Sequence, residues 1–325
     1  MEFFHNPRID WLGKKWYFLA FSMIFSVAGV TKMAWNWTHT VEGVHSPVPL
    51  SVDFRGGTQV QVRFQQAPNL TQVRQAVDAS GIHDARIENY DLEHPENHEV
   101  LISLPEQTNE NALDTGRTQI ETALRSRYAN SFSIRNVQVV GPTVGHQLER
   151  QAAIATVLSL AGMLVYLWFR FQLIYGVAAV VACFHDTLIT VGAFALTGQE
   201  ISLTVIAAIL TLIGYSMNDT IVVFDRIREN LRISRREPLP DLVNRSINQT
   251  LSRTVLTSGL TFLTVLSLYV FGGQVLRGFS FALVVGILIG TYSSIAVAAP
   301  MLVAYQEWRA GKDRAAALPA AKRTR

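Results

Sequence analysis

The sequence contains a single cysteine and few charged residues. Only 16% of its 325 residues are charged, against the roughly 25% usual in soluble domains. One cysteine excludes an internal disulfide and any metal site built from cysteines, so we interpret Cys183, which lies in an apolar run, as a small buried hydrophobic residue. Because 49% of the residues are hydrophobic, the composition favours a membrane protein.

A membrane-spanning helix needs about 20 mostly apolar residues, and the sequence offers six such segments. The first follows a basic flank, as a signal peptide would, but no small-residue cleavage site comes after it. We therefore interpret it as an uncleaved signal anchor. The six predicted spans are residues 16–35, 151–169, 173–197, 203–224, 255–272 and 279–305.

Arginine and lysine are distributed unevenly along the connecting segments. The N-terminal flank, the loop 226–252 and the tail 306–325 are basic, whereas the loops 198–202 and 273–278 are nearly bare. The positive-inside rule therefore predicts that both termini and the loop 226–252 are cytoplasmic. Within that loop, apolar residues recur at helical spacing over 239–247. This indicates an amphipathic helix, either on the membrane surface or packed beneath the bundle.

The segment between the first two spans is too long for a plain loop. It holds 14 acidic residues, eight arginines and no lysine, a net charge of −6. Its strand and helix periodicities follow the order βαββαβ, with a further leading strand predicted at residues 50–54. That order indicates a ferredoxin-like α+β domain, here outside the membrane. The predicted division is residues 1–37 for the N-terminus and first span, 38–149 for this domain, 150–305 for the other five spans and 306–325 for the tail.

Two pairs of glycines lie near the two ends of this predicted domain. Gly56 and Gly57, in "DFRGGT", predict a tight turn with positive φ. A phosphate-binding loop is the competing interpretation, but no helix with a Lys-Ser/Thr pair follows. Gly141 and Gly145, in "GPTVGHQLER", predict a hinge between the domain and the second span.

Two carboxylates interrupt the apolar spans. Asp219 lies in "GYSMNDTIVVFDRIREN", and Asp186 follows His185 in "ACFHDTLITVG". A central Asp costs about 2.5–3.5 kcal/mol on insertion scales, so it needs a partner or a water path. For both carboxylates, a fixed contact that only holds helices together is the structural alternative. For His185, a hydrogen-bonding role in helix packing is favoured.

Proton transport is the functional interpretation of these carboxylates. It requires a group that changes charge inside the bundle, and a buried carboxyl with a movable cation nearby can be tuned for this. Asp219 with Arg253 fits that description, and Asn218 and Thr220 are expected to supply hydrogen bonds around Asp219. Asp186 is a second candidate for proton transport.

The last predicted span carries two packing signals. Gly286 and Gly290 form a GxxxG pattern, in which small residues let helix backbones approach closely. Pro300 predicts a kink or a local break. We therefore expect this span to pack closely along its glycines and to bend near its proline.

Several long motifs occur together and in order. They are "GYSMNDTIVVFDRIREN", "SINQTLSRTVLTS" and "GTYSSIAVAAP", preceded by "DFRGGT" and "VGPTVG". Over nearly its whole length the chain thereby resembles the SecF-type members of the SecD/SecF family of protein-export membrane proteins, within the resistance–nodulation–division (RND) superfamily. The resemblance implies a six-helix half-unit in the bacterial inner membrane, with a periplasmic domain after the first helix. It also implies that Asp219 is the family's proton-handling Asp and that Arg253 works with it.

The resemblance further implies the partners and the function. SecD would complete a twelve-helix unit, which acts with the SecYEG channel, the SecA motor and, functionally, YajC. Unfolded exported polypeptides on the periplasmic side and membrane lipids are the other expected partners, and no nucleic acid is expected. The implied function is that of an accessory translocase subunit, not an enzyme, that uses the proton-motive force to promote export. Protons are the coupling ion, and no cofactor or metal is expected.

Three other functions fit parts of the sequence. Half of an RND-type exporter of small molecules or lipids is one, although such exporters carry two halves in one long chain with larger outer domains. An intramembrane aspartyl protease needs two Asp on neighbouring helices, as Asp186 and Asp219 provide, but the flanking "HD" and "ND" do not resemble protease motifs. A plain scaffold for SecD is the third, and proton-flux measurements on Asp219→Asn would distinguish it.

Overall fold

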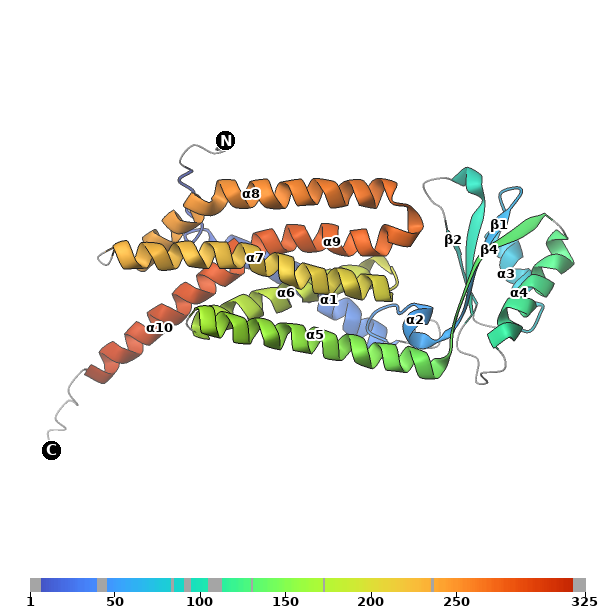
Figure 1. Cartoon of the computed structure of the whole chain (residues 1–325), viewed down its shortest axis with the longest axis horizontal. Helices are drawn as coiled ribbons and strands as arrows, with labels where there is room; N and C mark the ends of the chain where they lie inside the picture. The colour runs from blue at the N-terminus through green and yellow to red at the C-terminus, as the bar shows by residue number, and fades with distance from the viewer. Residues whose placement is uncertain are drawn as a thin grey trace, which may run out of the picture.

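The long helices form a bundle, with a small α+β domain at one end (Figure 1). The computed structural model describes residues 7–39, 46–82, 85–90, 95–104, 113–129, 131–171, 173–234 and 237–317. Within these ranges, six helices are long and apolar enough to cross a membrane. The predicted class, a multi-pass helical membrane protein with an α+β domain, is thus confirmed.

Five of the predicted spans coincide with one long helix each, and the sixth, 279–305, runs through two helices and the π-helical turn between them. Several helices continue past the apolar run. Hydropathy marks the part at membrane depth, whereas a helix continues until a cap or a breaker ends it. The Ser202 hydroxyl caps one helix, and Pro238 precedes the next. The helices are α1 (Lys15–Thr38), α5 (Pro142–Arg170), α6 (Leu173–Thr197), α7 (Leu203–Ile233), α8 (Leu239–Phe271), and α9 (Gly273–Ser293) followed by α10 (Ala299–Ala317).

The predicted amphipathic segment 239–247 is the first part of α8. Its Leu242, Val243 and Ile247 side chains are buried in the core of the bundle. The segment therefore packs beneath the bundle and does not lie on the membrane surface as a separate helix. Of the two predicted placements, on the membrane surface or beneath the bundle, the structure shows the second.

The chain before α1 binds to this part of α8. The backbone N–H groups of Trp11 and Leu12 both donate to Asn244 Oδ1 at 3.0 Å. Asn248 Nδ2 donates to the carbonyl of Ile9 at 2.9 Å, and its Oδ1 accepts from Trp11 Nε1 at 3.1 Å. The N-terminal segment, the start of α8 and the end of α10 therefore lie at the same end of the bundle, opposite the sheet (Figure 1).

The last span bends as Pro300 predicts. A π-helical turn, Ser294–Ala298, separates α9 from α10, and α10 points away from the axis of α9 (Figure 1). Proline has no N–H to donate to the carbonyl one turn earlier, and a wider turn accommodates that loss. The tail 318–325 lies outside the described residues.

The α+β domain has the predicted ferredoxin-like order. Its sheet runs β2-β3-β1-β4 with antiparallel neighbours, and α3 and α4 cover one face (Figure 1). Alternate residues of β1, such as Val60 and Val62, are fully buried against Ile102, Val73 and Ile120. The elements are β1 (Gly57–Phe64), α3 (Leu70–Asp78), β2 (Arg86–Asn89), β3 (Glu99–Leu104), α4 (Leu113–Tyr128) and β4 (Phe132–Val140).

The predicted leading strand at residues 50–54 is wrong. Val52–Arg55 form α2, a single helical turn. The Ser51 hydroxyl accepts a hydrogen bond from Asp53 N and starts that turn, so a local cap overrides the strand pattern. Gly56 and Gly57 follow with φ of 75° and 122°. Both values are positive, as predicted for these two glycines.

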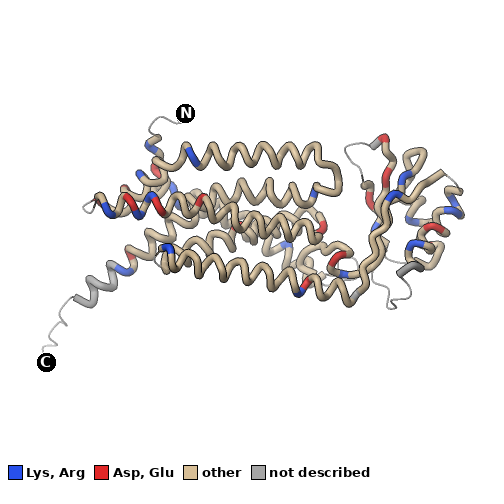
Figure 2. Tube along the Cα trace, viewed as in Figure 1, with Lys and Arg blue, Asp and Glu red and all other residues tan. Residues whose placement is uncertain are grey.

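Charged residues avoid the middle of the bundle. Figure 2 shows most Lys, Arg, Asp and Glu at the ends of the long helices and in the α+β domain. Among the described charged residues of the spanning helices, the buried ones are two carboxylates, Asp186 and Asp219, which are 1% and 3% exposed. These two groups define the candidate site.

Candidate proton site in the membrane bundle

Asp219 lies on α7 and faces α8. The Ser258 hydroxyl donates to Asp219 Oδ2 at 2.6 Å. Thr254, one turn before Ser258 on the same face of α8, is also buried, and its hydroxyl has no hydrogen-bond partner in the described part of the chain. Two hydroxyl groups thus line the α8 face that packs against the helix of Asp219.

Asp186 is the centre of a second polar cluster. Its Oδ2 accepts from the Ser216 hydroxyl at 2.5 Å and from the Ser293 hydroxyl at 2.7 Å. The His185 Nδ1 atom lies 3.0 Å from Asp186 Oδ1, and His185 Nε2 lies 2.5 Å from the Ser22 hydroxyl. The cluster therefore joins α1, α6, α7 and α9 through polar contacts in the middle of the bundle.

The residues expected to surround Asp219 do not bond to it here. Asn218 is exposed on another face of α7, and the Thr220 hydroxyl donates to the Ser216 carbonyl at 3.3 Å. Arg253 is exposed and forms no ion pair with Asp219 within the described residues. Adjacent residues of a helix point about 100° apart, so neighbours in sequence rarely share a face.

Sequence reasoning missed Ser258 as the partner of Asp219. The signal was present: Thr254 and Ser258 are four residues apart in an apolar span and so occupy one helical face. A buried carboxylate on a neighbouring helix requires hydrogen-bond donors, and a hydroxyl on that face, here that of Ser258, can supply one.

Close helix contacts hold the carboxylates in place. A Cβ atom at Gly286 would lie 2.3 Å from the Leu212 side chain, and one at Gly290 would lie 2.9 Å from Ser216 Cβ. The GxxxG face of α9 therefore lies directly on α7. This close approach allows the Ser293 hydroxyl on α9 to reach Asp186.

A second glycine contact has no GxxxG pattern and was not predicted. Gly29 of α1 and Gly192 of α6 meet so closely that a Cβ atom on either would lie 2.9 Å from the Cα of the other. This contact brings α1 near His185, whose Nε2 meets the Ser22 hydroxyl.

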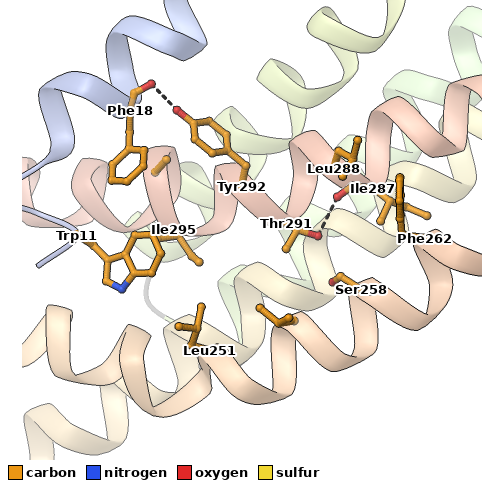
Figure 3. Close-up of a pocket in the computed structure, with 13 residues that line it drawn as sticks. Trp11, Phe18, Leu251, Ser258, Phe262, Ile287, Leu288, Thr291, Tyr292 and Ile295 are labelled. Atoms are coloured by element: carbon orange, nitrogen blue, oxygen red, sulfur yellow. Dashed lines mark hydrogen bonds between the residues drawn. The ribbon is translucent and has the colours of Figure 1, made fainter. Parts of the chain in front are cut away.

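An apolar cavity of about 370 Å³ lies beside Ser258. Figure 3 shows it between α8, α9 and the segment around Trp11 and Phe18, with the Tyr292 hydroxyl donating to the Phe18 carbonyl. Because Ser258 also bonds to Asp219, this apolar cavity ends one side chain away from the carboxylate.

The two predicted hinge glycines occupy different settings. Gly141 is the single residue between β4 and α5. Gly145 lies inside α5, where a Cβ atom would be 2.6 Å from the Phe54 carbonyl oxygen. Gly145 is therefore a close-packing position inside a helix, whereas Gly141 lies between two elements, and the hinge role of both stays a prediction.

Known families match most of the chain. Residues 119–308 match the family described as protein export membrane protein SecD/SecF, C-terminal, and residues 44–68 match the SecD/SecF GG motif. The protein translocase subunit SecF of Koribacter versatilis is 53% identical, covering 98% of this chain and 96% of that protein. The SecF subunit of Calditerrivibrio nitroreducens is 40% identical, covering 92% of this chain and 94% of that protein.

Longer relatives contain a similar region. The protein translocase subunit SecDF of Brucella abortus is 42% identical over 78% of this chain and 33% of its own length. The crystal structure of SecDF from Thermus thermophilus, a translocon-associated membrane protein, matches with a TM-score of 0.80 and 36% identity over 93% of this chain. This chain spans about two fifths of that structure, since 39% of it is covered. From these matches and its own fold, the chain belongs to the SecD/SecF family of protein export membrane proteins.

Proposed function

We propose that this chain is a proton-coupled accessory subunit of the Sec protein translocase, with Asp219 as its proton-carrying group. The translocase role follows from family membership, because its full-length relatives are SecF translocase subunits. The fused SecDF relatives support SecD as its partner. The observation that carries the proton proposal is a carboxylate buried in a spanning helix, with a neutral hydroxyl, Ser258, as its donor.

Movement of α8 against α7 would change the surroundings of Asp219. A cation favours the charged form of a carboxyl, and a neutral surrounding does not. Arg253 lies on α8 five residues before Ser258, so a shift of α8 would alter its distance from Asp219. We propose that closer approach of Arg253 releases the proton and that its withdrawal accompanies proton loading.

Asp186 is proposed as a second group on the same route. Its donor Ser216 lies on α7, three residues before Asp219, so both carboxylates depend on the position of one helix. His185 and Ser22 extend the cluster toward α1. The alternative, a fixed hub that only joins helices, predicts a different response to substitution, which is tested below.

The remaining partners and the location are part of the same proposal. We propose an inner-membrane protein with cytoplasmic termini that assists the SecYEG channel after SecA has acted, with YajC associated functionally. Support comes from the segment before α1 and the end of α10, which lie at the end of the bundle opposite the sheet (Figure 1). Exported polypeptides would meet the α+β domain, and lipids or SecD would cover α1 and α5, whose apolar windows are only 11% and 6% buried. The proton is the proposed coupling ion, and the proposal involves no other cofactor and no catalysis.

The test replaces Asp219 with Asn, which keeps the size but cannot release a proton at working pH. The variant and SecD are reconstituted together in vesicles, and proton uptake and stimulation of export are measured. We expect both to be lost while membrane insertion and SecD binding persist. Asp225→Asn is the matched control, because Asp225 lies on the same helix but is exposed. Proton uptake at the wild-type rate by Asp219→Asn would contradict the proposal.

A further inference from the structure

Asp53 joins the sheet to the helix that carries the proton site. It is buried, and both of its carboxylate oxygens accept hydrogen bonds. Asp53 Oδ2 accepts from the backbone N–H of Leu203 at 2.9 Å, and Oδ1 accepts from Gln138 Nε2 at 2.6 Å. Leu203 is the first residue of α7, and Gln138 lies in β4. A carboxylate is favourable at a helix N-terminus, where N–H groups lack partners within the helix.

The backbone on either side of this contact is also joined. Ser51 N donates to the Ile201 carbonyl at 3.0 Å, and Ile201 N donates to the Pro49 carbonyl at 2.8 Å. These two bonds make Leu50 and Ile201 a parallel bridge outside the main sheet. The residues just before α7 and its first N–H group are therefore all held by the segment 49–53.

The contact can transmit movement because the elements on both sides are continuous. α7 runs unbroken from Leu203 to Ile233, so Asp219 lies about 24 Å along the same helix from Leu203. On the other side, only Gly56 separates α2 from β1, which begins at Gly57. Displacement of α7 along its axis would reach the sheet through Asp53.

The opposite side of α2 is supported by α5. Gly145 packs so closely on α2 that a Cβ atom there would lie 2.6 Å from the Phe54 carbonyl oxygen and 3.0 Å from Gly56 N. The helical turn α2 is thus held between α5 and the start of α7. The backbone that leaves α2 has φ of 75° at Gly56 and 122° at Gly57, values that residues with side chains rarely adopt.

We propose that Asp53 is a positioning residue that couples α7 to the α+β domain, so that work done at the proton site moves the sheet. This inference rests on the proposed function, in which proton loading at Asp219 accompanies a change in the relative position of α7 and α8. In this proposal, residues 53–57 connect the two parts mechanically. Asp53 holds α2 to the start of α7, and the glycines at 56 and 57 join α2 to β1, so α2 moves with α7 and displaces the sheet.

The test exploits the fact that both Asp53 oxygens are acceptors. In Gln138→Glu, Asp53 Oδ1 faces a second carboxylate with no donor between them, so the contact with β4 is lost while the Leu203 contact stays. Adding Asp53→Asn supplies that donor from the new amide nitrogen, and the amide oxygen still accepts from Leu203, so the double variant restores both contacts and keeps the wild-type charge. We expect Gln138→Glu to export about tenfold less, as loss of roughly 1.4 kcal/mol of coupling implies, with proton uptake close to wild type. The double variant should recover most of the export.

The outcomes separate this inference from the proposed function. Wild-type export by Gln138→Glu, or an equal loss of export and proton uptake, would overturn the coupling role, because a merely structural residue affects both. The proposed function is judged independently by proton uptake of Asp219→Asn. If Gln138→Glu does not assemble with SecD, Gln138→Ala replaces it. That variant leaves the Leu203 contact intact and should show the same uncoupling, and wild-type export by it would refute the inference.

Discussion

The Ser258 hydroxyl on α8 donates to the Asp219 carboxylate on α7 across a distance of 2.6 Å. A hydroxyl can both donate and accept, so this contact can persist when Asp219 is protonated, with the hydrogen bond reversed. Ser258 therefore suits a site that alternates between two protonation states without losing its helix contact. A cationic partner, by contrast, would favour only one of those states.

Replacing Ser258 with Ala should impair proton transport. The change leaves the buried carboxylate without its donor, and we expect proton uptake to fall several-fold and the helix pair to lose about 0.6–1.7 kcal/mol of stability. Ser258→Thr is the matched control, since it keeps the hydroxyl at the same position. Proton uptake in vesicles and thermal unfolding in detergent measure the two effects. Equal uptake by the Ala and wild-type proteins would show that the hydroxyl is dispensable.

Arg253→Lys should be poorly tolerated. If Arg253 approaches Asp219 during the cycle, its guanidinium can make two parallel contacts and stays charged, whereas an ammonium is a single point charge that loses its proton more readily on burial. We expect lower export stimulation over the pH range of growth, measured in cells that depend on the variant. Full activity with Lys would reduce Arg253 to an anchor at the exposed surface of α8.

The positions of the helices and strands along the sequence were more predictable than the contacts between helices. Hydropathy and periodicity are local properties, so they located the six spans and the βαββαβ order. The Ser258–Asp219 contact depends on the rotation and relative height of two helices, which local patterns do not encode. Likewise, the strand pattern at residues 50–54 gave way to α2, because the Ser51 cap and a contact with Ile201, about 150 residues later, decide the local conformation.

The contact between Gly29 and Gly192 should tolerate no side chain. A Cβ atom at position 29 would meet the backbone of Gly192, which cannot rotate away as a side chain can. Gly29→Ala must therefore push α1 away from α6, and we expect the free energy of unfolding to fall by about 1–3 kcal/mol. Gly162→Ala on α5 is the control, since a Cβ atom there meets nothing within 4 Å. Thermal unfolding of both variants in one detergent gives the comparison. Similar melting temperatures for the two variants would mean that α1 can move away from α6 without loss of stability.

Asp186→Asn distinguishes a hub from a proton carrier. The Ser216 and Ser293 hydroxyls can accept from the new amide as readily as they donate to the carboxylate, so the cluster should persist and the melting temperature should change little. We nevertheless expect reduced proton uptake, because the amide does not titrate. Asp186→Leu, which removes every polar contact, should destabilise the bundle as well. Normal uptake by the Asn variant would leave Asp186 as a hub only.

The last prediction concerns a contact at the edge of the sheet. Arg86, on the edge strand β2, pairs with Glu200 at 3.0 Å and donates to the Gly198 carbonyl at 3.3 Å, both in the loop before α7. Partly exposed ion pairs contribute only about 0–1 kcal/mol. If the sheet pivots on the Asp53 contact, this weaker contact must open during each cycle, and Gly141 is positioned to absorb the rotation.

Locking that contact should therefore stop export. Cysteines at positions 86 and 200, introduced after Cys183→Ala and joined by a short reducible cross-linker, would hold the sheet against the bundle while leaving Asp219 in place. We expect export to be lost on cross-linking and restored on reduction, whereas each single-cysteine variant treated identically should be unaffected. If the locked protein exports as well as the unlocked one, the sheet does not move relative to this loop, and the domain is a passive docking surface for exported chains.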